Sequence, residues 1–334
     1  MTLFVWMIDT GALTNSNDHM SCLLSLVVLG FRNFDQTTRP CLESLLPWLN
    51  DAEIEILVVD NGSPDDSAQK TAVWCKQHPQ VRCLLSDINR GFAGGMNWGA
   101  AQATGKWLLL VNNDTVFPAH TLDAFKHVIL AAPADVAMLA PVTNAAGNGQ
   151  RLWKPDASFD DWLRIGEWLN RNPTYQLIPT YRSDFFSIAI RRDVWDELGG
   201  LDLSFGLGYY EDFEFSLRLT EAGYHQMITE DVFILHVGSA TFQGSKSARE
   251  LIKRNKKLLK SKHSKVRFEH TRLGNLEVLH TYAALKKQGL WTDALQARLN
   301  LRLDALKGDR PRSMLKRWLW GRRVSSLMRL LKVD

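Results

Sequence analysis

The sequence predicts an α/β protein in which a mostly parallel sheet is flanked by helices and followed by a basic, helical C-terminal extension. Between residues 23 and 131, short apolar runs alternate with segments of helical periodicity. That alternation is typical of parallel strands joined by right-handed helical crossovers. From Lys246 onward the chain becomes rich in Lys and Arg, and no convincing strand pattern remains.

The first half of the chain shows the clearest alternation. The run Leu23–Leu29 is short, continuous and apolar, and Gly30 follows it, which indicates a strand buried on both faces. The expected elements that follow are helix Thr37–Leu49, strand Ile54–Val59, helix Ser67–Gln77 capped by Asp65 or Asp66, strand Val81–Leu85, helix Phe92–Thr104, strand Lys106–Val111 and helix His120–Ala131.

Beyond about Val142 the pattern changes, and polar segments separate shorter elements. Glycines at 199, 200 and 223 end two of the helices, because glycine readily adopts the left-handed conformation found after a helix. The expected elements are helix Asp160–Asn170, strand Phe185–Ile190, helix Arg192–Leu198, a helix from Glu211 to Ala222, and short strands Gln226–Ile228 and Val232–Leu235.

The composition is that of an ordinary globular protein. Of 334 residues, 45% are hydrophobic and 23% are charged. The four cysteines have neither CxxC nor Cys/His spacing, which argues against a zinc site or a disulfide framework and favours a cytosolic chain. No run approaches the roughly 20 apolar residues needed to span a bilayer.

Charge is distributed unevenly along the chain. Residues 246–334 hold 24 Lys and Arg against 7 Asp and Glu, whereas residues 1–245 hold 16 against 29. An acidic body suits cation-assisted chemistry, and a basic tail suits attachment to something anionic. We place the boundary between them near Gln243–Ser247.

The N-terminal segment is not read as a signal peptide. Met1–Ile8 is apolar but short, lacks a basic region before it, and runs into a polar stretch. We therefore expect residues 1–20 to be an extension that need not be ordered, with Met20 as an alternative start.

Polar, carboxylate-bearing turns follow three successive strands. They are Asp60–Ser63, Asp87–Asn97 and Asn112–Asp114. In an open α/β sheet, ligands bind outside the carboxyl ends of the strands. Carboxylates and glycines gathered there predict a site for a nucleotide, its diphosphate and a hard cation such as Mg²⁺ or Mn²⁺.

Each of these turns also has a purely structural interpretation. Asp60 could bind a ribose or base, or simply belong to a tight turn. The glycines of Asn89–Gly99 could admit phosphate, or only allow close packing of helix on sheet. Asp114 could bind a metal, with Asn112 contributing a neutral oxygen, or both could merely form a polar turn.

Two later features add to the site. Glu211 and Asp212 begin a helix after a glycine-rich aromatic loop, where they could complement the helix dipole or act as a general base beside an acceptor hydroxyl. His236 follows an apolar run and could complete a metal or diphosphate site, or serve as a structural hydrogen-bonding group.

Together these segments resemble the inverting family 2 glycosyltransferases with a GT-A fold, especially the rhamnosyltransferase-like branch that acts on bacterial surface polysaccharides. The resemblance covers about residues 21–245. Its five stretches occur in the order of the family: Leu57–Ser63, Asn89–Asn97, Leu110–Asp114, Gly199–Asp202 through Tyr210–Glu214, and His236–Ser239.

The resemblance implies a domain organisation and a set of site residues. Residues 1–20 would be the extension, 21–245 the GT-A domain and 246–334 the basic tail. Asp212 would be the catalytic base, and Asp114 with His236 would bind Mg²⁺ or Mn²⁺. The residues implied to contact the nucleotide sugar are Asn33, Asp60, Asn61, Asp87, Arg90, Gly91, Gly95, Asn97, Asn112, Asn113 and Glu211.

The sequence departs from the family at two places. Asn112 occupies the first acidic position of the DxD motif, which implies fewer protein ligands for the metal. The turn after the first strand is Gly30–Asn33 rather than a Thr-Tyr-Asn-like run, which leaves the choice between UDP and dTDP open. Rhamnose, from dTDP-rhamnose, is a family-level expectation for the transferred sugar.

The reaction that the resemblance implies is a single displacement onto a hydroxyl of a glycan or a lipid-linked saccharide. A polyprenyl-phosphate hexosyl synthase and a non-catalytic sugar-nucleotide or glycan-binding protein are the alternatives. A dehydrogenase is disfavoured because the glycines neither follow the first strand nor have GxGxxG spacing.

The tail also has competing interpretations. Arg310–Lys332 mixes basic residues with Trp and Leu, which suits an anionic membrane surface. Its apolar residues form two helical faces separated by Gly321, and these could instead pack on the body. No nucleic-acid-reading motif is present, so no nucleic-acid partner is expected. We expect a cytoplasmic protein at the inner face of the cytoplasmic membrane.

Overall fold

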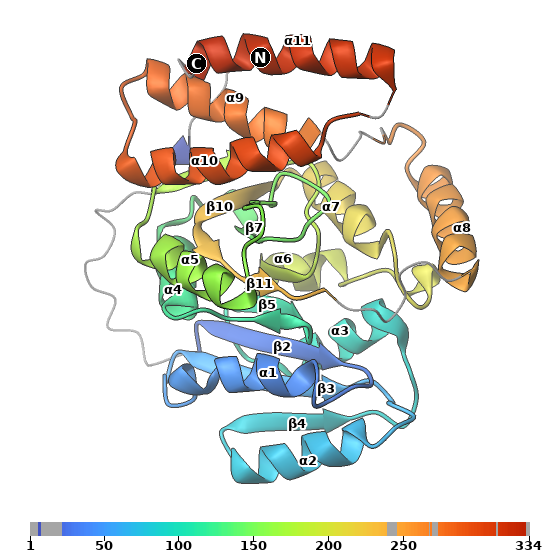
Figure 1. Ribbon diagram of the computed structural model, residues 1–334. Helices are drawn as coiled ribbons and strands as arrows, with labels where there is room; N and C mark the ends of the chain where they lie inside the picture. Colours follow the sequence, from blue (N-terminus) through green and yellow to red (C-terminus); the bar gives the residue numbers. More distant parts are fainter. Residues whose placement is uncertain are drawn as a thin grey trace.

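The computed structural model describes residues 6–7, 22–238, 246–266, 268, 273–311 and 313–331. The predicted extension 1–20 lies outside these residues except for Trp6–Met7, and so does most of the predicted boundary at 243–247. Within the described residues, helices and strands alternate as the sequence predicted (Figure 1).

A nine-stranded sheet forms the centre of the molecule. Its strand order is β1-β8-β10-β7-β9-β5-β2-β3-β4. Among these described strands, β8 and β9 run opposite to the others, so the sheet is mostly parallel as predicted. The strands are β1 Trp6–Met7, β2 Leu24–Gly30, β3 Ile54–Asp60, β4 Val81–Leu85, β5 Trp107–Asn112, β7 Val136–Val142, β8 Gln176–Pro179, β9 Ser187–Arg191 and β10 His225–Phe233.

Helices cover both faces of this sheet. On β2, Val27 and Leu29 belong to one hydrophobic core, whereas Leu26 and Val28 belong to the other. This alternation follows from the two-residue period of a strand. Helices α1, α2 and α4 pack on the side of Leu26, and α3, α6 and α7 pack on the side of Val27. The helices of the body are α1 Thr38–Ser44, α2 Ser67–Gln77, α3 Gly91–Gln102, α4 Thr121–Ala131, α5 Phe159–Arg171, α6 Arg192–Leu198 and α7 Glu211–Glu221.

Several elements differ from the sequence-based expectation. The helix expected over Thr37–Leu49 is divided into α1 and a 3₁₀ turn at Leu46–Trp48. The two short strands expected after Gly223 are largely one strand, β10. Strand β7 was not predicted, although all of its residues are buried.

The described part of the tail is helical, as predicted, and consists of α8 Lys246–Lys262, α9 Leu273–Lys287, α10 Asp293–Gly308 and α11 Met314–Leu331. Figure 1 shows α9, α10 and α11 stacked on the body, whereas α8 stands apart from them beside α7. None of the described helices is both long and apolar enough to cross a membrane.

Helices α9 and α10 share a core with the body. Tyr282 and Leu299 belong to the same buried cluster as Ile228 of β10. Arg302 of α10 forms an ion pair with Glu230 of β10, and both side chains are completely buried. Apolar packing and a buried charge pair therefore join this part of the tail to the sheet.

Candidate functional site

A cavity of about 580 Å³ opens at the edge of the sheet where β2, β3 and β5 end. Its volume is in the usual range for small-molecule sites. The predicted site residues that line it are Asn61, Gly91, Asn112, Asn113, Asp114, Glu211, Asp212 and His236. The structure therefore brings together residues from β5, α3, α7, strand β11 (Leu235–His236) and the two loops that follow β3 and β5.

In the cavity lining, Asn61 binds the glycine loop that begins α3. Its side-chain nitrogen donates to the carbonyl oxygen of Gly91 at 3.0 Å, and its side-chain oxygen accepts from the backbone N–H of Arg90 at 3.1 Å. Gly91 has a φ of +71°, and a Cβ there would lie 2.3 Å from the carbonyl oxygen of Gly206. The close approach of the two backbones requires glycine at this position.

Asn113 joins the loop after β5 to the start of α1 through its side-chain amide. Its side-chain nitrogen donates to the hydroxyl oxygens of Thr37 and Thr38, each at 2.9 Å. The N-terminal turn of α1 is thereby tied to the loop that carries Asp114.

Six predicted residues lie outside the cavity lining. The buried carboxylate of Asp60 accepts hydrogen bonds from the N–H of Ser63 at 3.0 Å and from its hydroxyl at 2.6 Å. Asn33, Asp87 and Arg90 are exposed. The Asp60 carboxylate is engaged within its own turn.

The other two, Gly95 and Asn97, have structural contacts. A Cβ at Gly95 would lie 2.5 Å from Leu29 Cδ1, so glycine allows α3 to pack closely on β2. The Asn97 amide donates to the carbonyl oxygen of Leu201 at 2.8 Å and accepts from the Leu201 N–H at 2.9 Å.

A short antiparallel pair of strands, β6 Thr115–Val116 and β11 Leu235–His236, brings Asp114 and His236 together. The His236 Nε2 atom lies 3.3 Å from Asp114 Oδ2. Its Nδ1 atom lies 2.9 Å from the carbonyl oxygen of Ala145, which can only accept, so Nδ1 carries a proton. Burial lowers the pKa of His236, but hydrogen bonding to Asp114 and its charge outweigh burial, and the pKa is raised.

This arrangement fits a hard divalent cation. The Nε2 atom of His236 faces the Asp114 carboxylate, while Nδ1 is anchored by a backbone carbonyl, as is usual for metal-binding histidines. The described residues contain no group of three His, Cys, Asp or Glu side chains able to hold an ion. Mg²⁺ and Mn²⁺ suit such a sparse set, because substrate phosphates and water supply their other ligands.

Two acidic side chains lie at the start of α7. Glu211 is only 6% exposed, and its Oε2 atom has no hydrogen-bond partner. Burial, together with the charge of Asp212, raises the pKa of Glu211 to about 8. Burial also raises the pKa of Asp212, whereas the Arg182 guanidinium lowers it. Asp212 Oδ1 accepts from the N–H of Phe213 at 2.7 Å.

Two charged residues of this site were not predicted from the sequence. Arg182 and Asp184 line the cavity, and the Arg182 guanidinium lies 3.5 Å from the Asp184 carboxylate. They precede β9, which is antiparallel to β5. Because β9 is reversed, its beginning meets the edge at which the parallel strands end. In the sequence these two residues are only polar residues before a predicted strand, and the sequence did not show in which direction that strand runs.

Comparisons with known proteins agree with this architecture. Residues 26–198, just over half of the chain, match the family model described as glycosyl transferase family 2. The chain is 29% identical over 196 residues to glycosyltransferase GlyG of Streptococcus pneumoniae, covering 54% of this chain and 60% of GlyG. It is 33% identical over 118 residues to succinoglycan biosynthesis protein ExoO of Rhizobium meliloti, covering 35% of this chain and 32% of ExoO.

The chain thus spans less than two thirds of these relatives. Among solved structures, mannosyltransferase PcManGT of Pyrobaculum calidifontis, in complex with GDP-Man and Mn²⁺, aligns with a TM-score of 0.52 at 16% identity. That alignment covers 91% of this chain and 80% of PcManGT, and it supports the predicted GT-A fold. With the family model matched over β2 to α6, the chain belongs to glycosyl transferase family 2.

Proposed function

We propose that the protein is an inverting glycosyltransferase that moves a sugar from a nucleoside-diphosphate sugar to a hydroxyl of a glycan or a lipid-linked saccharide. One observation carries this proposal: the Asp114–His236 pair and the Glu211–Asp212 pair line the same cavity. A cation site and a base are the two requirements of such a transfer. The name of ExoO, a succinoglycan biosynthesis protein, supports a role in polysaccharide synthesis.

Asp114 and His236 would hold Mn²⁺ or Mg²⁺, with Asn112 contributing a neutral oxygen. The PcManGT complex, which contains Mn²⁺, supports this proposal. When bound, the cation stabilises the negative charge on the leaving nucleoside diphosphate. At the glycine loop, the N-terminus of α3 and the Gly91 backbone would approach the diphosphate.

Asp212 would act as the general base. It takes the proton from the acceptor hydroxyl while that oxygen forms a bond to the anomeric carbon. The bond from the anomeric carbon to the diphosphate oxygen breaks in the same step, and the nucleoside diphosphate leaves with the electron pair. Attack opposite the leaving group inverts the configuration. The Arg182 guanidinium supports the role of Asp212, because it favours the ionised carboxylate that a base requires.

The remaining predicted contacts, at Asn33, Asp60, Asn61, Asp87, Arg90, Asn113 and Glu211, are proposed for the nucleotide and sugar, whereas Gly95 and Asn97 make contacts within the protein. dTDP-rhamnose is the first donor to try, because the sequence resembles the rhamnosyltransferase-like branch.

A thermal-shift panel of UDP, dTDP, GDP and NAD, each with and without Mn²⁺ or Mg²⁺, tests the proposal. A ligand that binds only the folded protein raises its Tm by mass action. We expect a metal-dependent rise with one nucleoside diphosphate and its loss in Asp114→Ala. Asp123→Ala, at an exposed carboxylate on α4, is the matched control. The absence of a shift with every diphosphate would refute the proposed donor site, and a shift with NAD alone would favour a dehydrogenase.

Measurements of turnover distinguish the proposed transferase from its two alternatives on the same fold. A polyprenyl-phosphate synthase has a phosphate acceptor that needs little help from a base, so its rate would depend weakly on Asp212. A sugar-nucleotide or glycan-binding protein would bind donor but show no transfer with any acceptor.

We also propose that α11 contacts an anionic membrane surface, which suits a lipid-linked acceptor and a location at the inner face of the cytoplasmic membrane. The helix carries five Lys and Arg and no Asp or Glu. Near its start, Met314, Leu315, Trp318 and Leu319 are between 48% and 86% exposed. Basic helices with exposed Trp and Leu bind anionic lipid interfaces.

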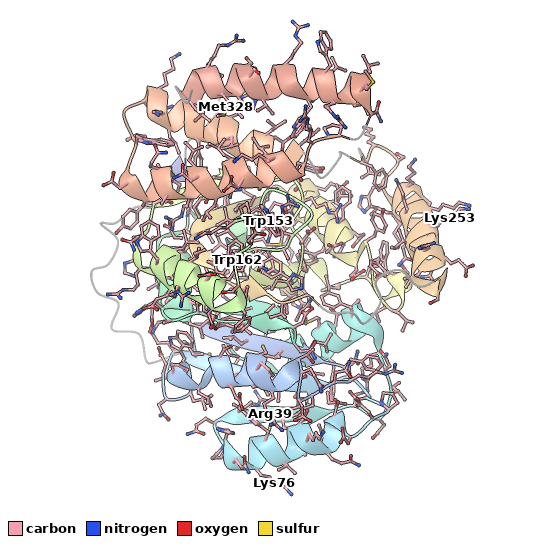
Figure 2. All side chains as sticks on the ribbon, viewed as in Figure 1. Arg39, Lys76, Trp153, Trp162, Lys253 and Met328 are labelled. Carbon is pink, nitrogen blue, oxygen red and sulfur yellow. The ribbon has the colours of Figure 1, made fainter. Side chains whose placement is uncertain are left out.

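The opposite side of α11 packs on the protein. Leu327 and Leu331 are buried in the shared core, so the second apolar face of the tail is a packing face. Figure 2 labels Met328 on this helix, close to α9. Deletion of the chain from Pro311 onward would therefore uncover the core as well as remove the exposed face.

Point substitutions test the membrane contact more cleanly than truncation. We expect Leu315→Ser/Trp318→Ser to lower binding to phosphatidylglycerol vesicles at low salt while Tm stays within about 2 °C. Leu130→Ser, at an exposed apolar residue of α4, is the control. Equal partitioning of the variant and the unmodified protein would exclude α11 as the contact.

A further inference from the structure

The loop before the proposed base adopts an unfavourable backbone conformation. Gly206, Tyr209 and Tyr210 have φ values of +74°, +72° and +77°. For tyrosine, this left-handed conformation costs of order 1–3 kcal/mol and persists only where the surrounding structure holds it. The loop also contacts the glycine loop, because the N–H of Phe92 donates to the carbonyl oxygen of Leu207 at 3.3 Å.

Asn255, on α8, contacts the backbone of this loop. Its side chain is completely buried. The amide nitrogen lies 2.8 Å from the carbonyl oxygen of Phe205, 2.8 Å from that of Gly208 and 2.9 Å from that of Tyr209. The two N–H bonds of this amide are thus shared among three backbone carbonyls within five residues, in a region where unpaired carbonyls would be costly.

Neighbouring residues of α8 support the same contact. Arg254 donates to the carbonyl oxygen of Ser204 at 2.9 Å, and Lys262 lies 2.8 Å from the Asp202 carboxylate. Leu259 packs with Phe205 in a small core of its own. Ile252, one turn before Asn255, lines the cavity. Helix α8 therefore contacts this loop, and the residues just before it, from Arg254 to Lys262.

We propose that Asn255 is a positioning residue for the transfer reaction: it holds the loop at 205–210 so that Glu211 and Asp212 face the cavity. The first helix of the basic tail then belongs to the active site, although its charge alone predicts a binding surface. Asn255 acts through the backbone of the loop and needs no contact with substrate. The effect on the transfer reaction rests on the proposed function, whereas the effect on the loop does not.

Two measurements on the full chain test this inference. In Asn255→Ala, we expect the amides of residues 206–211 to exchange hydrogen at least 10-fold faster, with unchanged exchange in β5. We expect kcat to fall 10- to 100-fold with the donor identified by the thermal-shift panel, while the KM for that donor changes less than 3-fold. A purely structural role would lower Tm without lowering the kcat of the folded fraction.

The controls lie on the same helix. Lys253→Ala should change neither exchange nor kcat, because Lys253 is exposed and points away from the body (Figure 2). If Asn255→Ala does not fold, Arg254→Ala, which removes the bond to Ser204, should give a smaller increase in the exchange of the same amides. Unchanged loop exchange in the folded variant overturns the proposal, even if the transferase itself is confirmed. If the loop amides of Asn255→Ala exchange faster but the protein binds no nucleoside diphosphate, the proposed function is contradicted and the role of Asn255 in holding the loop is not.

Discussion

Two parts of the cavity lining, the glycine loop and the start of α7, differ in how their polar groups are satisfied. At the glycine loop, both amide atoms of Asn61 are hydrogen-bonded to the backbone of the loop. At the start of α7, the buried Glu211 retains an unpaired carboxylate oxygen. Paired groups are held in place before any ligand arrives, whereas an unpaired oxygen can still bind a substrate group. We therefore expect a rigid glycine loop and a Glu211 carboxyl that gains a partner when substrate binds.

The largest expected effect tests whether these two parts of the lining act independently. Asp212→Asn should lower kcat by about 10²–10⁴-fold, the range typical of losing a general base. The Tm shift caused by the nucleoside diphosphate should persist, because Asp212 is not among the residues proposed to bind it. Asp196→Asn, at an exposed carboxylate of α6, is the control. Near-normal transfer by Asp212→Asn would remove this residue from the mechanism.

The second prediction concerns a substitution in the glycine loop. Gly91→Ala should lower the free energy of unfolding by about 2–4 kcal/mol and weaken nucleotide binding, because its Cβ would collide with the Gly206 carbonyl. Gly199→Ala separates strain from collision: its φ is +74°, but nothing lies within 4 Å of a Cβ there. Denaturant unfolding of both variants gives the comparison. Equal losses would mean that the close approach at Gly91 contributes nothing.

The smallest effect concerns pH. Because burial raises the pKa of Glu211 to about 8, the folded protein holds a proton there that the unfolded chain releases above its ordinary pKa near 4.5. Glu211 should therefore favour folding at low pH and lose this contribution as pH rises from about 4.5 to 8. Glu211→Gln should reduce the fall in stability over that window by about 1–3 kcal/mol. Parallel curves of Tm against pH for the two proteins would contradict this prediction.

The sequence predicted the parallel part of the fold well, because buried strands such as β2 are continuous apolar runs between turn residues. It did not predict β7, which contains Pro141, a residue that usually argues against a central strand. The sequence also did not reveal that β9 is antiparallel to its neighbours, and for this reason Arg182 and Asp184 were not placed in the site. Pairing partners are set by tertiary packing, which residue spacing does not record.

Roles within the glycine segment were equally ambiguous in the sequence. Gly91 lines the cavity, whereas Gly95, four residues later, makes room for Leu29. Both are glycines on one helix, so only their neighbours in space distinguish them. Asn255 gave no signal at all, because nothing in a run of basic residues shows that one amide turns inward.

The buried pair of Glu230 and Arg302 has a consequence for how the protein is made. Glu230 emerges from the ribosome 72 residues before its partner, and both side chains end up completely enclosed. At roughly 5–20 residues per second, the strand must wait on the order of 4–14 s for the arginine that neutralises it. During that interval the Glu230 carboxylate also lacks the helices that cover it, since Tyr282 of α9 and Arg302 of α10 are its neighbours. The outer face of β10 is therefore completed only after α10 has been synthesised.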